Sequence, residues 1–90
     1  MAVGEKNLEK TLKALANQRR IAIVRFVRQK KEASVGDIAE AIKLSFKATS
    51  RHLGRLLAAD ILDKEQRSLQ VFYRISNDLS DHTRKILSVI

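Results

Sequence analysis

The sequence is constrained most by two adjacent helical patterns that are followed at once by a strand pattern. Ser34 stands three residues before Asp37, a variant of the capping box that begins helices. The apolar residues that follow share one side of a helix: Val35, Ile38, Ala39 and Ile42. The letters "KLS" (43–45) end this helix, and Ser45 can cap a second one over about 46–59. A short helix, a tight turn and a longer helix are typical of a helix-turn-helix.

After Asp60 the apolar period changes from that of a helix to that of a strand. Alternate residues from position 69 onward are apolar: Leu69, Val71, Tyr73 and Ile75. Residues 61–65 can form the antiparallel partner across a turn near Arg67 and Ser68, which predicts a β-hairpin, or wing, over about 61–75. Because Ser68 stands where such a turn usually has Gly, we expect the turn to be longer than two residues or differently shaped.

Helical patterns also flank this central region. Leu8, Leu12 and Leu15 predict a first helix over about 5–16, and Asn17 can cap a second, strongly apolar helix that runs to about Lys30 and lies centrally. A last helix is expected over about 77–90. The predicted fold is therefore mainly α with a small β-hairpin: a winged helix-turn-helix of about five helices plus a two-stranded wing. With only 90 residues, residues 1–90 should form a single domain.

The charge balance favours a polyanionic partner. Lys and Arg number 18 against 10 Asp and Glu, a formal net charge of +8, so nucleic acid is the first expectation and acidic lipid the second. No apolar run approaches the roughly 20 residues that cross a bilayer, and Glu5, Asn7 and Glu9 interrupt any signal peptide. We therefore expect a cytoplasmic protein without membrane contact. The absence of Cys excludes disulfides and thiolate metal sites.

The predicted second helix of the motif is basic on one side. On a helical wheel, Lys47, Arg51 and Arg55 share the exposed arc with two small residues, Gly54 and Ala58. The opposite, core-facing arc holds Phe46, Thr49, Leu53, Leu56 and Leu57. A helical face that is merely solvated usually mixes Glu with Lys, but no acidic residue occurs from Ala41 to Ala59. The pattern favours a helix that enters the major groove of DNA over one that is basic by chance.

Three segments carry a family resemblance: "LKALANQRRIAIVRFV" (12–27), "GDIAEAIKLSFKATSRHLGRLLAADIL" (36–62) and "VFYRI" (71–75). In these segments the chain resembles the ArsR/SmtB (arsenic-repressor) family of winged helix-turn-helix transcriptional regulators. The resemblance implies a dimeric repressor that binds double-stranded DNA. Its terminal helices would form the dimer interface, and its basic helix would enter the major groove of an operator.

The family pattern at the start of the basic helix is matched only in part. Ser50 and Arg51 match it, Lys47 replaces a Ser, and Phe46 replaces the usual Gln. For Phe46 we favour a core contact over an apolar contact to a thymine methyl group. Lys43 replaces the Gly or Asn that the family often has in the turn, where a left-handed conformation is wanted, and it would be strained by about 1 kcal/mol if it has a positive φ. The predicted DNA-binding residues are Lys43, Lys47, Ser50, Arg51, Arg55 and, at the wing tip, Arg67, which could equally be only solvated.

The metal ligands of the family are missing. Metal-sensing members carry two Cys where this chain has Ser34 and Gly36. Other members bind zinc through Asp and His on the last helix, but here His82 is alone, and the chain ends at Ile90 before a second His could occur. Tetrahedral zinc requires about four ligands, so we predict no metal and no cofactor. His52 is expected to be a packed, hydrogen-bonded residue.

The terminal helices suggest a homodimer. Their apolar stripes are more than a small core can cover, and such exposed stripes mark an interface; the predicted interface residues are Leu8, Leu12, Leu79, Ile86, Leu87 and Ile90. A two-fold dimer would place two basic helices roughly 34 Å apart on a pseudo-palindromic operator. The alternative is that the last helix folds back onto its own domain.

We therefore predict a sequence-specific transcriptional regulator of the repressor type. No catalytic motif is present, so an enzyme is not expected. Two alternatives remain. The first is an architectural protein that coats DNA without reading its sequence, because "RRIAIVRFVRQKK" (19–31) adds further cations. The second is a winged-helix module for protein contacts, which is disfavoured because the exposed arc carries no aromatic residue.

Overall fold

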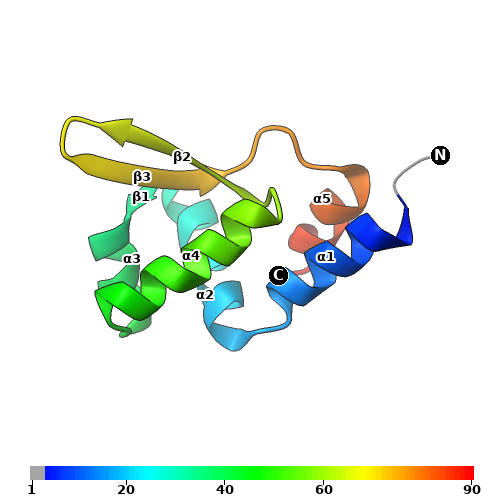
Figure 1. Ribbon diagram of the computed structural model, residues 1–90, viewed down its shortest axis with the longest axis horizontal. Helices are drawn as coiled ribbons and strands as arrows, with labels where there is room; N and C mark the ends of the chain where they lie inside the picture. Colours follow the sequence, from blue (N-terminus) through cyan, green and yellow to red (C-terminus); the bar gives the residue numbers. More distant parts are fainter. Residues whose placement is uncertain (1–3) are drawn as a thin grey trace.

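In the computed structural model, which describes residues 4–90, the chain forms five helices and a three-stranded antiparallel sheet (Figure 1). The helices are α1 (Glu5–Leu15), α2 (Gln18–Lys30), α3 (Val35–Ile42), α4 (Phe46–Ala58) and α5 (Asp81–Ser88). The strands are β1 (Ala33–Ser34), β2 (Leu62–Arg67) and β3 (Gln70–Ile75). The predicted winged helix-turn-helix is confirmed, with α3 and α4 as the motif and the β2–β3 hairpin as the wing.

Side-chain caps begin the helices where the sequence predicts them. Asn17 accepts a hydrogen bond from the backbone N–H of Arg20, and Ser34 and Ser45 cap α3 and α4 in the same way. The last helix is shorter than the predicted 77–90. Ser76 Oγ accepts from the backbone N–H of Asp78 in a turn, and Ser80 then caps α5. This turn uses local side-chain hydrogen bonds that compete with a helix.

The sheet has one strand more than predicted. Strand order is β1-β3-β2, and β1 pairs with the middle of β3. A strand of two residues is too short to give a period in the sequence, so the sequence pattern does not predict β1. The expectation of a long wing turn is wrong, because Arg67 pairs with Gln70 and leaves a turn of two residues. Ser68 takes φ +57° there, while Leu69 lies in the turn and outside the strand.

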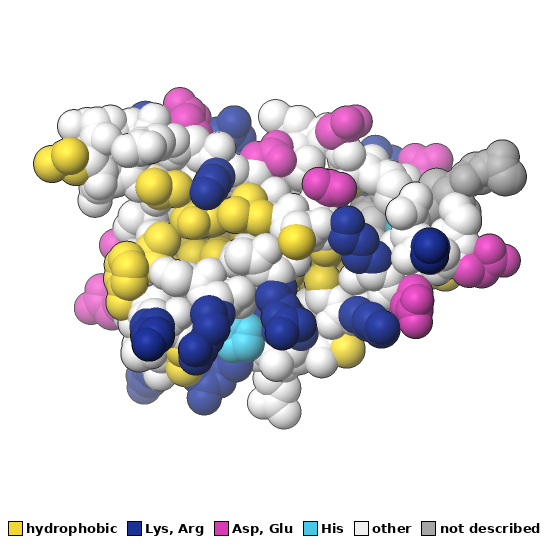
Figure 2. Space-filling view, in the orientation of Figure 1, with side chains coloured by type: hydrophobic (Ala, Val, Ile, Leu, Met, Phe, Trp, Pro, Cys, Tyr) yellow, Lys and Arg dark blue, Asp and Glu magenta, His cyan; other side chains and the backbone are white. Residues whose placement is uncertain are grey.

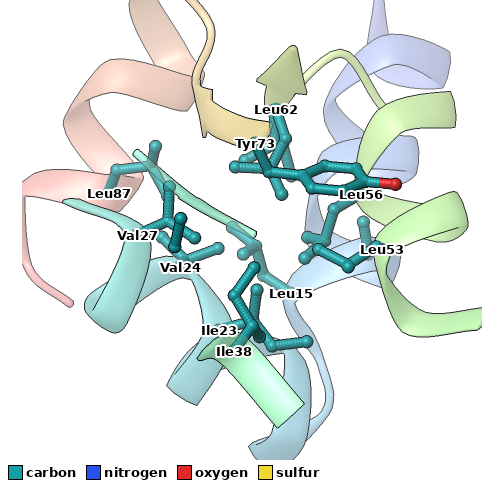
Figure 3. Packing of buried hydrophobic residues seen from close by; sticks show 13 residues of the cluster. Leu15, Ile23, Val24, Val27, Ile38, Leu53, Leu56, Leu62, Tyr73 and Leu87 are labelled. Atoms are coloured by element: carbon teal, nitrogen blue, oxygen red, sulfur yellow. The ribbon is translucent and has the colours of Figure 1, made fainter. Parts of the chain in front are cut away.

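The hydrophobic core surrounds α2, as the apolar character of that helix predicts. Ile23, Val24 and Val27 have no exposed surface, and α2 contacts α1, α3, α4 and β3. Figure 3 shows side chains from all these elements and from α5 pointing into one cluster. Packing on several sides of α2 fixes the orientation of the helix-turn-helix relative to the rest of the domain.

Helices α1 and α5 contact each other at the end of the molecule away from the wing tip (Figure 1). Leu8 and Leu12 on α1 are exposed, whereas Leu79, Ile86 and Ile90 are half-buried against the core. Leu87 is only 4% exposed, so its prediction as a free interface residue is wrong. Helix α5 folds back onto its own domain with this side chain and keeps a partly exposed apolar edge. None of the helices within residues 4–90 combines the length and apolar character needed to span a bilayer.

Candidate nucleic-acid interface

The exposed face of α4 has the composition that the helical wheel predicts. Lys47, Arg51 and Arg55 are exposed, as are the small residues Gly54 and Ala58. Leu53, Leu56 and Thr49 on the opposite side are fully buried. Figure 2 shows the resulting row of Lys and Arg side chains along α4, and an apolar area between this row and the wing. The face is smooth between its cations, so another surface can approach the helix closely.

The turn between α3 and α4 is held in a left-handed conformation by a non-glycine residue. Lys43 has φ +57° and ψ +52°, and its N–H ends α3 by donating to backbone carbonyls of that helix. The side chain of Lys43 is exposed just before the start of α4. Lys43 therefore extends the positive surface of α4 beyond the N-terminal end of the helix.

A buried guanidinium attaches the back of α4 to the first helix. Arg20 is 9% exposed and donates from Nε to the carbonyl of Ala14 at 2.5 Å and from Nη2 to that of Lys13 at 3.3 Å. Its Nη1 lies 3.2 Å from Nδ1 of His52 on α4. Because an arginine has no acceptor, Nδ1 must accept this hydrogen bond and carry no proton. His52 is thus the packed, hydrogen-bonded residue that the sequence predicts.

The surroundings of His52 are strongly cationic. Burial, and then the positive charges of Arg20, Arg19, Arg51 and Arg55, lower the pKa of His52. Burial and the nearby Arg55 likewise lower the pKa of Arg20. Arg19 is exposed at the start of α2, and it joins the cations of α4 on one surface. The sequence prediction did not place Arg19 there, because only the packing of α2 against α4 brings the two helices together.

The core position predicted for Phe46 is wrong. Its side chain is 62% exposed, although the helical wheel places it on the apolar arc. A wheel gives the direction of a side chain around the axis, but it does not say how far the core extends along the helix. Phe46 is the first residue of α4 and lies beyond the end of the core. The exposed end of this helix therefore does carry an aromatic residue.

Arg67 on the wing is bound by other parts of the protein. Its guanidinium forms ion pairs with Glu32 and, at 3.5 Å, with Glu65, and it lies 4.3 Å above the centre of the Phe72 ring. The hydrogen bond between Glu32 and Arg67 raises the pKa of Arg67 and lowers that of Glu32. The residue that projects freely from the wing tip is Leu69, which is 95% exposed. A DNA contact by Arg67 stays a prediction, and it would have to compete with these two carboxylates.

His82 is held by hydroxyl groups. Its Nε2 lies 3.4 Å from Thr11 Oγ1 and 3.2 Å from Ser80 Oγ, at the edge of a small polar cavity of about 180 Å³ between α1 and α5. Within residues 4–90, no three His, Cys, Asp or Glu side chains gather closely enough to hold a metal ion.

Comparison with known proteins identifies relatives of the same architecture. Residues 17–64, more than half of the chain, match the model of the bacterial regulatory proteins of the arsR family. The chain is 36% identical over 76 residues to the transcriptional activator HlyU of Vibrio cholerae, covering 81% of this chain and 69% of that protein.

Solved structures give the same result for the fold. A structure of HlyU from Vibrio cholerae superimposes with a TM-score of 0.84 at 28% identity and covers 99% of this chain and 92% of that one. The solution structure of a homodimeric winged helix-turn-helix DNA-binding domain from Mycobacterium bovis, described as a possible ArsR-family regulator, has a TM-score of 0.81. It is 23% identical and covers 99% of this chain and 85% of that one. At 23% identity, the similarity to the M. bovis domain concerns the fold alone.

Proposed function

The chain belongs to the arsR family of bacterial regulatory proteins, and from this premise we propose that it represses transcription by binding a specific operator as a homodimer. It is a transcriptional regulator with a DNA-binding winged helix. The proposal adds the sequence specificity, the direction of regulation and the residues that contact DNA.

The observation that carries the proposal is the exposed, acid-free face of α4. Three cations stand in a row there, separated by residues with almost no side chain. A helix of this kind fits the major groove, where its N-terminal residues contact base edges. Cations along the helix neutralise phosphates on both sides of the groove. The proposed DNA-contacting residues are Lys43, Lys47, Ser50, Arg51, Arg55 and, with a smaller contribution, Arg67.

A homodimer is supported by the exposed apolar side chains of α1 and by a homodimeric domain of the same fold. Leu8 and Leu12 are 38% and 48% exposed on the same helix, and the partly exposed apolar edge of α5 lies beside them. The M. bovis domain of the same fold is homodimeric. Two-fold pairing through α1 and α5 would present two copies of α4 to successive turns of a pseudo-palindromic operator.

The direction of regulation follows from where the dimer would bind. A dimer on two successive major grooves occludes any promoter element that it overlaps, so we propose repression. The relative HlyU is named an activator, so the sign needs a direct test. A reporter behind the chain's own upstream region should be more active when the gene is deleted. Lower reporter activity in the deletion strain would make the protein an activator.

Architectural coating of DNA is less well supported by the structure. This alternative relies on the additional cations of α2, but Arg28 donates to the carbonyl of Leu87 at 2.6 Å and Arg25 to that of Ile90 at 3.2 Å. These two guanidinium groups stabilise the end of α5. Fewer cations are then free to bind phosphates outside the helix-turn-helix.

DNA affinity as a function of salt tests the proposal. A duplex from upstream of the gene is compared with a scrambled duplex of equal length. A preference of roughly 10³-fold for the upstream duplex at physiological salt would mean base readout. Equal affinities with the same steep salt dependence would contradict specificity and favour the architectural alternative. No binding to either duplex would favour the alternative in which the basic face binds a protein partner.

A further inference from the structure

Phe46 is an exposed aromatic residue at the end of the recognition helix. Among the aromatic residues of the chain, Phe26 and Phe72 are half-buried and Tyr73 is buried, whereas Phe46 is 62% exposed. The rest of the domain covers only the smaller part of this side chain, because Phe46 is the first residue of α4. Exposed aromatic surface is unfavourable in water, so a binding partner that covers the ring would gain affinity.

The position of the ring relative to the basic residues indicates what that partner is. Phe46 follows the cap Ser45 and immediately precedes Lys47, so it belongs to the first turn of α4. In helix-turn-helix proteins, the N-terminal residues of this helix contact base edges while cations along it hold the backbone. If Lys47 and Arg51 bind DNA as proposed, the end of α4 that carries Phe46 enters the same major groove.

The wing leaves the ring accessible. Phe46 lines one side of an open groove of about 300 Å³, whose other walls are the start of α3 at Val35 and the wing residues Leu69 and Val71. No carboxylate lines this groove, so a phosphate backbone can pass beside it without repulsion.

We infer that Phe46 reads sequence by packing against the C5-methyl group of a thymine in the major groove, an inference that rests on the proposed operator binding. A phenyl ring has no hydrogen-bond donor or acceptor, and the thymine methyl is the apolar group that base pairs present in the major groove. Phe46 makes one position of each half-site selective for thymine.

Replacing thymine by uracil, which lacks only this methyl group, tests the assignment. The preferred duplex is first selected from a randomised library, and each thymine in one half-site is then replaced singly. We expect the wild-type protein to lose about three- to fivefold in affinity at one position, the factor that corresponds to burying one methyl group. Phe46→Ala should bind the thymine duplex more weakly and lose nothing further at that position.

Leu69→Ala is the matched control, because it removes another apolar side chain from the same groove. This variant should keep the wild-type uracil profile. Phe46→Leu retains an apolar contact, and it should keep part of the thymine preference if Phe46→Ala folds poorly. Thermal melting of each variant separates loss of folding from loss of binding.

Two results would overturn the inference while leaving operator binding intact. The wild-type protein could show no sensitivity to uracil at any position, or Phe46→Ala could keep the same uracil profile as the wild type. Either result would assign the exposed ring to a contact other than a thymine methyl group. Failure of the selection to yield any preferred sequence would instead contradict the proposed function itself.

Discussion

At the scale of single residues, the backbone carries strain that the side chains do not relieve. None of the glycines described in residues 4–90 has a positive φ. Four other residues there do: Lys31, Lys43, Asp60 and Ser68. For an ordinary side chain this conformation costs roughly 1–2 kcal/mol. The turn inside the helix-turn-helix and the turn of the wing both include such a residue. Their shapes are therefore imposed by the packing on either side.

Replacing Lys43 by Gly should stabilise the domain. Glycine has no Cβ to clash at φ +57°, so we expect the free energy of unfolding to rise by about 1 kcal/mol. For a domain of this size, the melting temperature should rise by roughly 4–8 °C. Lys43→Ala keeps the Cβ and should give no such gain. An unchanged or lower melting temperature for Lys43→Gly would contradict strain at this position.

Stability should fall in mild acid because of His52. Its pKa is lowered in the folded protein, first by burial and then by the neighbouring arginines, so the unfolded chain binds the proton more tightly. The contribution of neutral His52 is full above the unfolded pKa of about 6.5 and is lost as the pH falls toward the lower folded value. His52→Gln can still accept from Arg20 without titrating. As the pH is lowered, the melting temperature of this variant should therefore fall less than that of the wild type. Parallel curves of melting temperature against pH would show that His52 is not the cause of the acid sensitivity.

At the scale of elements, the recognition helix agrees with its sequence pattern except at its first residue. Periodicity predicts which arc of α4 faces the core, because the direction of each side chain follows from 3.6 residues per turn. It cannot predict that the core stops short of Phe46, since this depends on the tertiary packing of α3 and the wing. The same limit applies to Arg67, whose partner Glu32 is 35 residues away along the chain.

The cations of α4 should contribute separately to the salt dependence of DNA binding. Each of Lys47→Ala, Arg51→Ala and Arg55→Ala should reduce the slope of log affinity against log salt by about 0.9. Lys30→Ala is the control, because Lys30 lies beside a cavity lined by Glu32, Asp37 and Glu40, where phosphate is repelled. An equal effect of the control would mean that only net charge matters.

The ion pair between Glu32 and the wing should restrain DNA binding. Glu32→Gln removes one of the two carboxylates that pair with Arg67 and leaves Glu65, so the guanidinium can reach a phosphate more easily. We expect a modest gain in DNA affinity, a steeper salt dependence and little change in melting temperature, because exposed ion pairs contribute little to stability. Combined with Arg67→Ala, the substitution should give no gain. A gain that persists without Arg67 would contradict this explanation.

The architecture as a whole could be predicted more fully than its details. Caps at Asn17, Ser34 and Ser45, the apolar α2 and the change of period after Asp60 together specify a winged helix-turn-helix, because each is a local signal. The third strand, the two-residue wing turn and the burial of Leu87 depend on contacts between distant segments. Which residues contact DNA is still a prediction. The cations of α4 are exposed, as the helical wheel predicts.

At the scale of the whole molecule, dimerisation and folding should depend on different leucines. Leu12→Glu places a charge on the exposed stripe of α1, so it should shift the protein to a monomer at micromolar concentration in sedimentation velocity. Leu69→Glu, which changes a still more exposed leucine on the wing, should leave the dimer intact. Leu87→Ala should cost about 2–5 kcal/mol of folding stability, because it opens a cavity in the core. A wild-type monomer at this concentration would contradict the dimer.

The Arg20 guanidinium connects the first helix directly to the recognition helix. A single planar group is bonded both to the carbonyl end of α1 and to His52 on the recognition helix. Because the donors of a guanidinium have a fixed planar geometry, these hydrogen bonds couple the position of α1 to that of α4. A change in the position of α1 would therefore reach α4 through this side chain as well as through the direct contacts between the two helices.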